Sequence, residues 1–270
     1  MSSAQPVEAE AASPPHPYHL VTPSPWPALG SLGAFIIAFG AVQWWHGGTT
    51  LICAAGFVVV LTTMGLWWRD VIREAQRDHA HTDEVQHGLR VGMGLFIASE
   101  VMFFVAFFWA FFNSGLRVNP SITQWPPATI QPLDTWGIPF LNTLILLSSG
   151  LCVNWAHHSL RQGDRDGLKK GLALAVVLGA SFLGLQAYEY GHAAFAFRDG
   201  VYPSIFYMAT GFHGFHVFVG VCFLSVTLLR SWRGDFTPRQ HVGFEAAAWY
   251  WHFVDVVWIF LFIWVYWWGS

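Results

Sequence analysis

The sequence has 270 residues, of which 54% are hydrophobic and only 11% are charged, and its mean hydropathy is +0.42. Soluble domains of this size carry about 25% charged residues, so the composition excludes a water-soluble enzyme and indicates a membrane protein. The 13 Lys and Arg against 16 Asp and Glu give a net charge of −3. This balance excludes the basic surface that nucleic-acid binding requires.

Beyond its N-terminus, the chain has the pattern of a series of membrane helices. Residues 1–27 contain several prolines and no Lys or Arg, so we expect a flexible tail and no cleavable signal, which would need a basic start. Crossing a bilayer takes about 20 apolar helical residues, and none of the long apolar stretches alternates polar with apolar residues as a β-barrel would. The sequence therefore predicts an all-α integral membrane protein with seven spans, at Ala28–Trp45, Thr49–Trp68, Val91–Phe112, Phe140–His158, Gly171–Tyr190, Ser204–Arg230 and Phe244–Trp268.

Basic residues gather in alternate connections between these spans, which tests their number independently. With seven crossings, eleven of the 13 Lys and Arg fall on one side, and short loops on the cytoplasmic side, or its equivalent, accumulate such residues. We therefore expect the N-terminus inside and the C-terminus outside. The eleven are Arg69, Arg73, Arg77, Arg90, Arg161, Arg165, Lys169, Lys170, Arg230, Arg233 and Arg239, whereas Arg117 and Arg198 fall on the opposite side.

The connections indicate how the spans are grouped. The turn between the first two spans is so short that they must form an antiparallel hairpin. The polar segment 69–90 pairs acids with bases three residues apart and should extend the second helix out of the bilayer. We expect a hairpin unit, 28–90, splayed from a five-helix bundle, 91–270, with a cleft that lipid would fill. The connection 113–139 contains five prolines and should be an external loop without regular structure.

Small side chains within the predicted spans are interpreted as packing residues. Cys53, Cys152 and Cys222 each lie in an apolar run, far apart and without a Cys or His at metal-ligand spacing, so they predict neither disulfides nor a thiolate metal site. Glycines let helices approach closely in membranes, and we expect this role for Gly88, Gly92, Gly211, Gly214 and Gly220.

Four carboxylates within the spans are candidates for function, because ionisable groups are costly in a membrane. Glu189 and Glu245 lie at span ends, where we interpret them as interfacial groups that water or headgroups reach. Glu100 lies nine residues into the third span, about 13 Å deep at about 1.5 Å per residue, and Asp255 is similarly deep in the seventh. These two acids are therefore the main candidates.

Their neighbours in sequence differ. Asp255 has His252 three residues earlier on the same helical face, and His213 and His216 on the sixth span could approach it, so we predict a buried polar cluster of these four. Glu100 has no ionisable residue within a helical turn, and apolar surroundings should keep its carboxyl neutral much of the time. It is interpreted either as a protonated carboxyl bonded to a neighbour such as Ser99, or as a group for proton access or lipid contact.

The 13 histidines of the chain are candidate metal ligands. Only His213, His216 and His252 are deep enough to hold a haem between helices, which we keep as a minor alternative to a structural role. Two Glu-x-x-His matches are typical of di-iron carboxylate proteins, but Glu84–His87 and Glu189–His192 lie at opposite faces of the membrane. The sequence therefore predicts no metal or catalytic centre on this chain.

Several long strings resemble subunit III of cytochrome c oxidase. In the first half they are Trp67–Glu74, Leu95–Phe104 and Trp155–Leu160. In the second half they are Asp199–Tyr202, Thr210–Val217, Gly243–Trp258 and Tyr266–Ser270. The resemblance covers the chain from about Pro17 to its last residue, and strings of this length and rarity make a chance match negligible.

The resemblance implies a seven-helix subunit with a V-shaped, lipid-filled cleft and no redox group of its own. Haem and copper would belong to the partner subunits I and II of a complex that oxidises cytochrome c, reduces oxygen to water and moves protons outward. The chain would sustain proton uptake and protect the catalytic subunit from turnover inactivation. Glu100 corresponds to the family's carbodiimide-reactive acid, and the positions implied to bind phospholipid are Trp67, Trp68, Arg69, Glu74, His81 and Arg230.

Two other functions are compatible with these residues. A quinol oxidase has a related subunit, which commonly lacks the first two helices, and a self-contained proton-coupled transporter could use Glu100 and Asp255 as a relay. Transporters usually show internal repeats, and none is found here. The scarcity of lysine beside arginine favours a bacterial plasma membrane over a mitochondrial one. The histidines of the inner face are either solvated loop residues or proton buffers: His16, His19, His79, His81 and His87.

Overall fold

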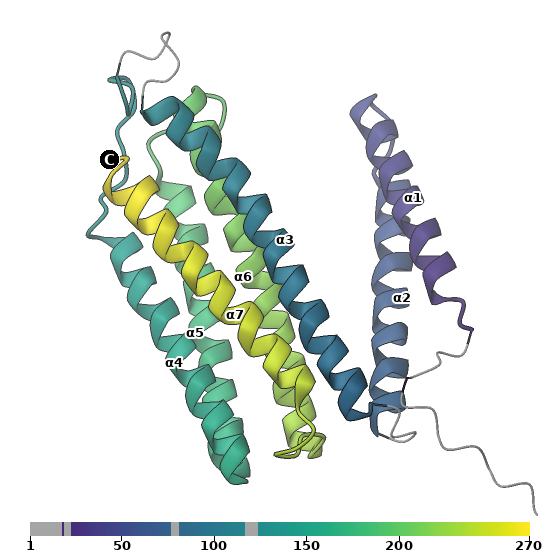
Figure 1. Ribbon diagram of the computed structural model, residues 1–270. Helices are drawn as coiled ribbons and strands as arrows, with labels where there is room; N and C mark the ends of the chain where they lie inside the picture. Colours follow the sequence, from purple (N-terminus) through teal and green to yellow (C-terminus); the bar gives the residue numbers. More distant parts are fainter. Residues whose placement is uncertain (1–17, 19–22, 77–80, 117–123) are drawn as a thin grey trace, which may run out of the picture. The chain divides into compact units, whose positions relative to one another are not determined.

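The computed structural model describes residue 18 and residues 23–76, 81–116 and 124–270. Within these residues the chain forms seven helices long and apolar enough to cross a membrane (Figure 1), which confirms the predicted class and number of spans. The last helix continues into a π-helical turn, η1. The elements are α1 Trp26–Trp45, α2 Leu51–Gln76, α3 Asp83–Gly115, α4 Ile138–Gln162, α5 Arg165–His192, α6 Val201–Arg233, α7 Val242–Leu261 and η1 Phe262–Trp267.

The chain divides into two compact units, Met1–Gly88 and Leu89–Ser270. In the first unit, α1 and α2 pack against each other as the predicted hairpin. Their contact depends on glycine, because a Cβ at Gly40 would collide with the backbone of Cys53, and one at Gly56 would lie 2.6 Å from the backbone nitrogen of Ile37. Small residues that let backbones approach closely are typical of helix contacts in membranes.

The extension predicted for the second span over 69–90 is present only as far as Gln76, because α3 already begins at Asp83. Helix α2 continues past Trp68 to Gln76. The carboxylate of Asp70 accepts a hydrogen bond of 2.9 Å from the indole nitrogen of Trp26 at the start of α1, and Arg69 lies 3.2 Å from the same carboxylate. These contacts tie the start of α1 to the end of α2, where the hairpin leaves its apolar stretch.

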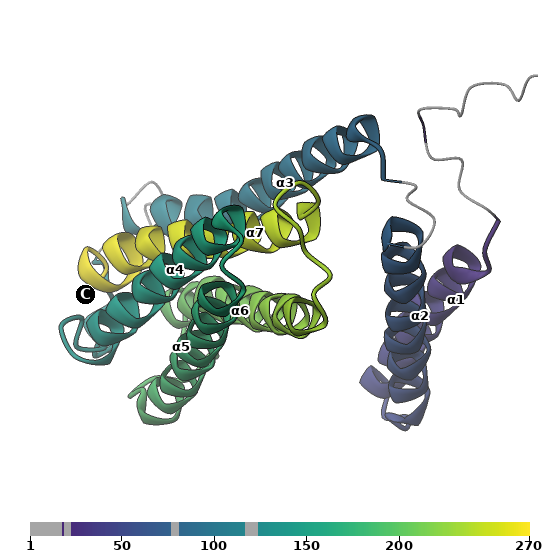
Figure 2. The ribbon, with the colours of Figure 1, turned by 90° about the horizontal axis from the view of Figure 1, so that it is seen from below.

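The second unit is a bundle in which α4, α5, α6 and α7 pack in sequence and α4 also contacts α7. Seen from below (Figure 2), α3 runs along the side of the bundle that α7 and α6 form. Aromatic pairs hold it there: the ring centroids are 5.1 Å apart for Phe103 and Phe212, and 6.0 Å apart for Phe104 and Phe253. The aromatic face of α3 therefore determines which helices it contacts.

Helix α7 forms the centre of the bundle. Its indoles Trp251 and Trp258 are fully buried, and each donates a 2.9 Å hydrogen bond to a hydroxyl of α4, that of Ser149 and that of Thr143 respectively. An indole N–H inside a membrane protein needs such a partner, because no water is available to accept from it. The two bonds therefore fix α7 against α4.

Fewer of the five named glycines make close helix contacts than the sequence predicted. A Cβ at Gly220 would lie 2.7 Å from the ring of Trp251, which confirms a close approach there. At Gly211 the nearest atom would be the Tyr190 hydroxyl oxygen at 4.0 Å. Among the described residues, a Cβ would meet nothing within 4 Å at Gly88, Gly92 and Gly214, so these three make no close helix contact there.

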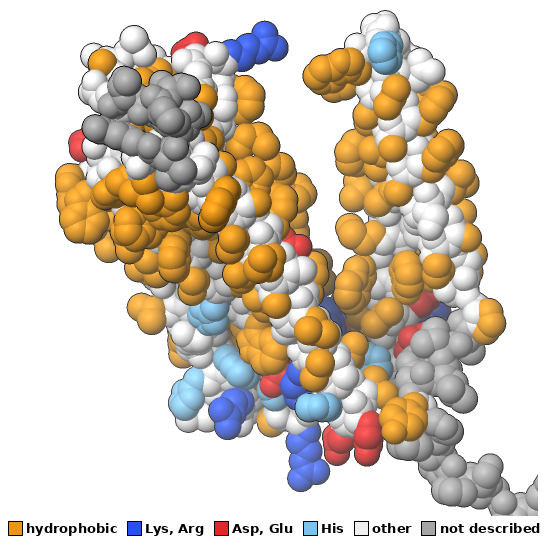
Figure 3. All heavy atoms as spheres, turned by 45° about the horizontal axis from the view of Figure 1, so that its top comes forward, with side chains coloured by type: hydrophobic (Ala, Val, Ile, Leu, Met, Phe, Trp, Pro, Cys, Tyr) orange, Lys and Arg blue, Asp and Glu red, His pale blue; other side chains and the backbone are white. Residues whose placement is uncertain are grey.

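The surface matches a chain embedded in lipid. Large apolar side chains are exposed along the helices, among them Phe35, Leu95 and Leu151. Figure 3 shows hydrophobic side chains covering the flanks of the bundle, with Lys, Arg and His near the end that carries the α4–α5 and α6–α7 connections. The described part of the proline-rich connection, 124–137, contains no helix, as predicted.

Candidate functional site

Glu100 of α3 and His216 of α6 form a hydrogen-bonded pair inside the membrane segment. The distance from His216 Nε2 to Glu100 Oε2 is 2.8 Å, and the side chains are 9% and 23% exposed. The other ring nitrogen of His216 lies 2.7 Å from the carbonyl oxygen of Phe212. A carbonyl can only accept, so Nδ1 carries a hydrogen and Nε2 faces the carboxyl group.

This geometry leaves one proton to be shared. Either Nε2 carries it and an imidazolium faces a carboxylate, or the carboxyl carries it and donates to a neutral imidazole. The rings of Phe103 and Phe104 lie with centroids 5.9 and 5.0 Å from that of His216. Aromatic carbon thus surrounds the pair on the bundle side and limits the access of water.

The partner of Glu100 corrects the sequence analysis. In one of the two interpretations Ser99 bonds the carboxyl, but its hydroxyl instead donates to the carbonyl of Phe96 at 2.6 Å. His216 is 116 positions away in sequence, so no local pattern on the third span could have identified it. The pair forms because the aromatic contacts of α3 with α6 bring the two helices together.

The predicted polar cluster around Asp255 is smaller than expected. His252 and Asp255 lie together, with Nδ1 3.3 Å from Oδ2, and the other ring nitrogen of His252 is 2.9 Å from the amide oxygen of Asn154 on α4. His213 is only 1% exposed and bonds the carbonyl of Val254 at 3.2 Å. The structure therefore joins neither His213 nor His216 to the Asp255 carboxylate.

The physical reason is the position of α6 between its neighbours. Residues three apart lie on the same side of a helix but diverge by about 60°, and on α6 this divergence directs the two rings to different helices. His216 points at α3, whereas the ring of His213 packs between Phe182 of α5 and Trp258 of α7, at centroid distances of 5.7 and 5.0 Å. Two histidines that share one helix thus serve different contacts.

Glu189 is not the interfacial acid that the sequence predicted. Its residue is 3% exposed, and its Oε1 accepts a 2.8 Å hydrogen bond from the hydroxyl of Tyr266 in η1. That hydroxyl accepts in turn from the side-chain amide of Gln186 at 3.2 Å. The prediction is wrong because α5 continues to His192 and the end of the seventh span covers Glu189.

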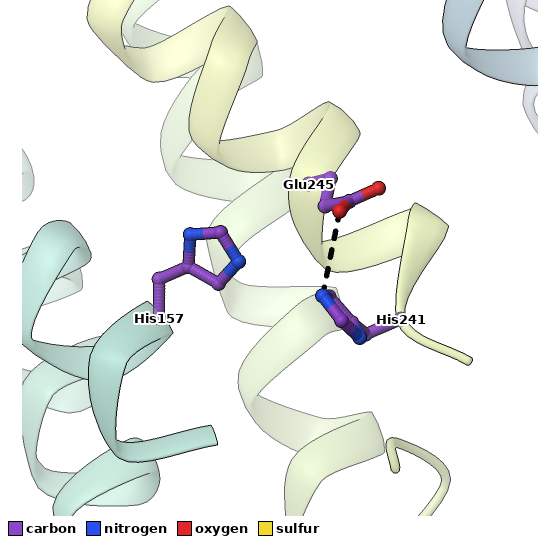
Figure 4. Close-up of side chains that lie close together, drawn as sticks. All are labelled: His157, His241 and Glu245. Carbon is purple, nitrogen blue, oxygen red and sulfur yellow. Dashed lines mark ion pairs between the residues drawn. The ribbon is translucent and has the colours of Figure 1, made fainter. Parts of the chain in front are cut away.

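A further group of side chains lies at the end of the bundle with the α4–α5 and α6–α7 connections (Figure 4). His157 of α4, His241 just before α7 and Glu245 of α7 place one ligand atom each within 4.8 Å of one another. Glu245 is held by Arg90 of α3, whose Nε lies 2.7 Å from Oε2. The group was missed from sequence, although His241 and Glu245 are four residues apart, a spacing that puts them on one helical face.

The residues implied to bind lipid headgroups have diverse surroundings. The indoles of Trp67 and Trp68 are 42% and 60% exposed near the end of α2, as is typical of residues at a membrane interface. The Nε of Arg230 lies 3.3 Å from Asp235, and its guanidinium lies over the ring of Phe236 at 4.5 Å. Of the remaining expected residues, Arg69 and His87 are exposed, Glu74 and His81 are partly exposed, and His16, His19 and His79 lie outside the described residues.

Comparison with known proteins identifies the family. A family model described as cytochrome c oxidase subunit III matches residues 16–270. Cytochrome c oxidase subunit 3 from Marchantia polymorpha is 56% identical over 259 residues, which cover 94% of this chain and 97% of that protein. The proteins of the same name from Branchiostoma lanceolatum and Sus scrofa are 53% and 52% identical, over 95% and 94% of this chain and 98% of each relative.

These relatives also bear on localisation. They come from plants and animals, so they do not support the expected bacterial plasma membrane. The match to the family model and the identity over nearly the full length agree with the strings noted in the sequence, and the chain belongs to the cytochrome c oxidase subunit III family.

Proposed function

We propose that this subunit of cytochrome c oxidase acts as a non-redox accessory subunit that binds phospholipid, sustains proton uptake and protects the catalytic subunit from inactivation during turnover. Its partners in the complex would be the haem–copper subunit I and the copper-bearing subunit II, with cytochrome c as the substrate of the whole. In this proposal the chain contributes no electron-carrying centre.

The Glu100–His216 pair is the observation that carries the proposal. It is a proton-sharing pair within a membrane helix, with a carboxyl that is still 23% exposed at its surface. A carbodiimide activates the protonated form of an acid, and the neutral state of the pair supplies that form. The pair is thus suited to hold a proton at the surface of α3 without contacting a redox group.

The lipid part of the proposal depends on the first unit. Trp67, Trp68 and Arg69 are exposed where α2 leaves its apolar stretch, and such a mixture of indoles and charge is typical of contact with headgroups. The expected V-shaped, lipid-filled cleft stays a prediction. A density map of the assembled complex with phospholipid between the hairpin and the remaining helices would support it.

Replacing Glu100 tests the accessory role. In the purified complex, Glu100→Gln should abolish carbodiimide labelling of this chain, because the amide has no acid to activate. The haem absorption spectrum and most of the initial oxygen consumption should remain, whereas the number of turnovers before inactivation should fall several-fold. Labelling is measured by mass spectrometry of the subunit, and turnover is measured with an oxygen electrode.

Glu84→Gln is the matched control. Glu84 is an exposed acid on the same helix, so its loss should leave labelling and turnover number as they are in the unaltered complex. Loss of the haem signals, or an immediate stop of oxygen reduction in Glu100→Gln, would contradict an accessory role. A chain that purifies without haem-bearing partners would instead favour the proton-coupled transporter.

A further inference from the structure

His241 and Glu245 face each other with atoms that both accept hydrogen bonds. The Nδ1 of His241 lies 3.1 Å from the carbonyl oxygen of Thr237, so Nδ1 carries a hydrogen. In the neutral ring Nε2 then presents its lone pair, and it lies 3.4 Å from Oε1 of Glu245. Two acceptors at this distance need a proton or a cation between them.

The ring of His157 adds a third lone pair, on nitrogen, beside His241 and Glu245. Its Nε2 is buried and has no hydrogen-bond partner among the described residues. Figure 4 shows its ring directed from α4 toward the other two side chains. A buried ring nitrogen without a partner loses its hydrogen bond to water and gains nothing in return, which costs about 1–3 kcal/mol. A ligand bound among the three side chains would remove that cost.

We propose that His157, His241 and Glu245 form a binding site for a divalent transition metal ion, with Zn²⁺ the best fit. Zinc takes imidazole nitrogen at about 2.0–2.1 Å and carboxylate oxygen at about 2.0–2.2 Å in a tetrahedral arrangement, so its ligand atoms lie about 3.4 Å from each other. The separation of His241 Nε2 and Glu245 Oε1 is 3.4 Å. The ligand atom of His157 lies within 4.8 Å of the other two, so it has to move closer to them when the ion binds.

The chemistry of the ligands selects among metals. Two imidazoles disfavour Ca²⁺ and Mg²⁺, which take oxygen ligands, and favour zinc and the later transition metals. Two histidines and a glutamate leave the fourth tetrahedral position for water. Both ligand orientations are already fixed from outside: the Thr237 carbonyl holds the His241 ring, and Arg90 holds the second oxygen of Glu245 at 2.7 Å.

A doubly protonated His241 paired with Glu245 is the competing explanation. It would satisfy the Nε2 of His241 and the Oε1 of Glu245, but it would leave the buried Nε2 of His157 without a partner. A metal ion gives all three inward-facing atoms a partner at once. The two explanations differ in the amount of zinc bound per complex, which can be measured.

The test uses the intact oxidase complex, stripped with a chelator, re-equilibrated with ZnCl₂ and desalted. Zinc per haem is then measured by mass spectrometry of the metal. The unaltered complex should retain one equivalent of zinc more than the His157→Ala or His241→Ala complex. Loss of a residue that only orients a metal ligand lowers metal affinity by about 10–100-fold, and loss of a ligand itself should lower it further. X-ray absorption at the zinc edge should show two imidazole ligands and oxygen ligands for the zinc that the unaltered complex retains and the variants lose.

His158→Ala is the matched control, since His158 is exposed on the next position of α4 and lies 2.9 Å from Gln162 rather than in the group. It should retain zinc like the unaltered complex. Equal zinc in all four proteins would overturn the proposal. If the two variants fail to assemble, anomalous scattering from zinc-treated unaltered complex decides, and the absence of a peak among the three side chains would overturn it equally.

Discussion

A carboxyl group within a membrane helix is stabilised when another side chain shares its proton or its charge. Glu100 has the imidazole of His216, Asp255 has that of His252, and Glu189 has the phenol of Tyr266. The Glu189 pair is the most enclosed, because the amide of Gln186 bonds the same hydroxyl. At the scale of single residues, these partners offset the cost of placing a carboxyl group inside the membrane.

Tyr266→Phe isolates the contribution of one such partner. It removes the hydroxyl that donates to Glu189 Oε1 and accepts from the amide of Gln186, so both groups lose this hydrogen bond. Burial of polar groups without their partner costs about 1–3 kcal/mol, so the thermal midpoint of the subunit should fall. Tyr188→Phe is the control, since that ring is 53% exposed, and its midpoint should stay unchanged. Equal midpoints for the two variants would contradict a stabilising bond.

Only one of these three partnerships could be predicted from sequence. His252 and Asp255 are three apart on one helix, a spacing that local periodicity makes visible. His216 is 116 positions from Glu100, and Tyr266 is 77 from Glu189. Such contacts depend on how helices pack, and the amphipathic pattern that would indicate packing is weak when both the core and the lipid are apolar. The same reason hid His157 beside Glu245.

At the scale of helices, Trp251 of α7 sets how closely its neighbours approach. A Cβ at Gly220 of α6 would lie 2.7 Å from the indole, and one at Gly179 of α5 would lie 2.5 Å from it. The indole cannot move aside easily, because its nitrogen is bonded to Ser149. The two glycines therefore form the surface on which one of the two fully buried indoles of the core packs.

Alanine substitution separates this packing from helix propensity. Gly220→Ala should destabilise the subunit by about 1–3 kcal/mol through overpacking against Trp251. Gly214→Ala lies on the same helix in open space and should instead stabilise it by up to about 1 kcal/mol, because alanine favours the helix. Thermal unfolding in detergent compares the two. A higher midpoint for Gly220→Ala than for Gly214→Ala would refute the tight contact.

Span number was predictable, but span ends were not. The third span was expected to begin at Val91, whereas α3 begins at Asp83. Acidic Asp83 and Glu84 occupy its first turn, where negative charge favours the helix N-terminus, and the Thr82 hydroxyl lies 3.4 Å from the backbone nitrogen of Val85. Hydropathy marks the membrane thickness, and capping residues mark where the helix begins, so helix ends lie beyond the apolar stretch.

For the whole molecule, an odd number of crossings puts the two termini on opposite sides of the membrane. The seven helices that the described residues form satisfy that condition. Basic residues flank the α4–α5 connection, with Arg161 and Arg165 on its two sides, and the end of α7 carries none. Short loops rich in Lys and Arg stay on the side of the membrane from which the chain is inserted. We therefore expect Gln162 inside and Ser270 outside.

Cysteine accessibility tests this orientation. With Cys53, Cys152 and Cys222 replaced by Ala, Ser270→Cys and Gln162→Cys each introduce one thiol at an exposed position. In sealed vesicles whose outer face is the face without the basic connections, a membrane-impermeant maleimide should label only Ser270→Cys, and in inverted vesicles only Gln162→Cys. Detergent should expose both, which shows that protection comes from the membrane and not from a partner subunit. Labelling of both thiols from the same side would mean an even number of crossings between them, and the distribution of arginine and lysine would then need another cause.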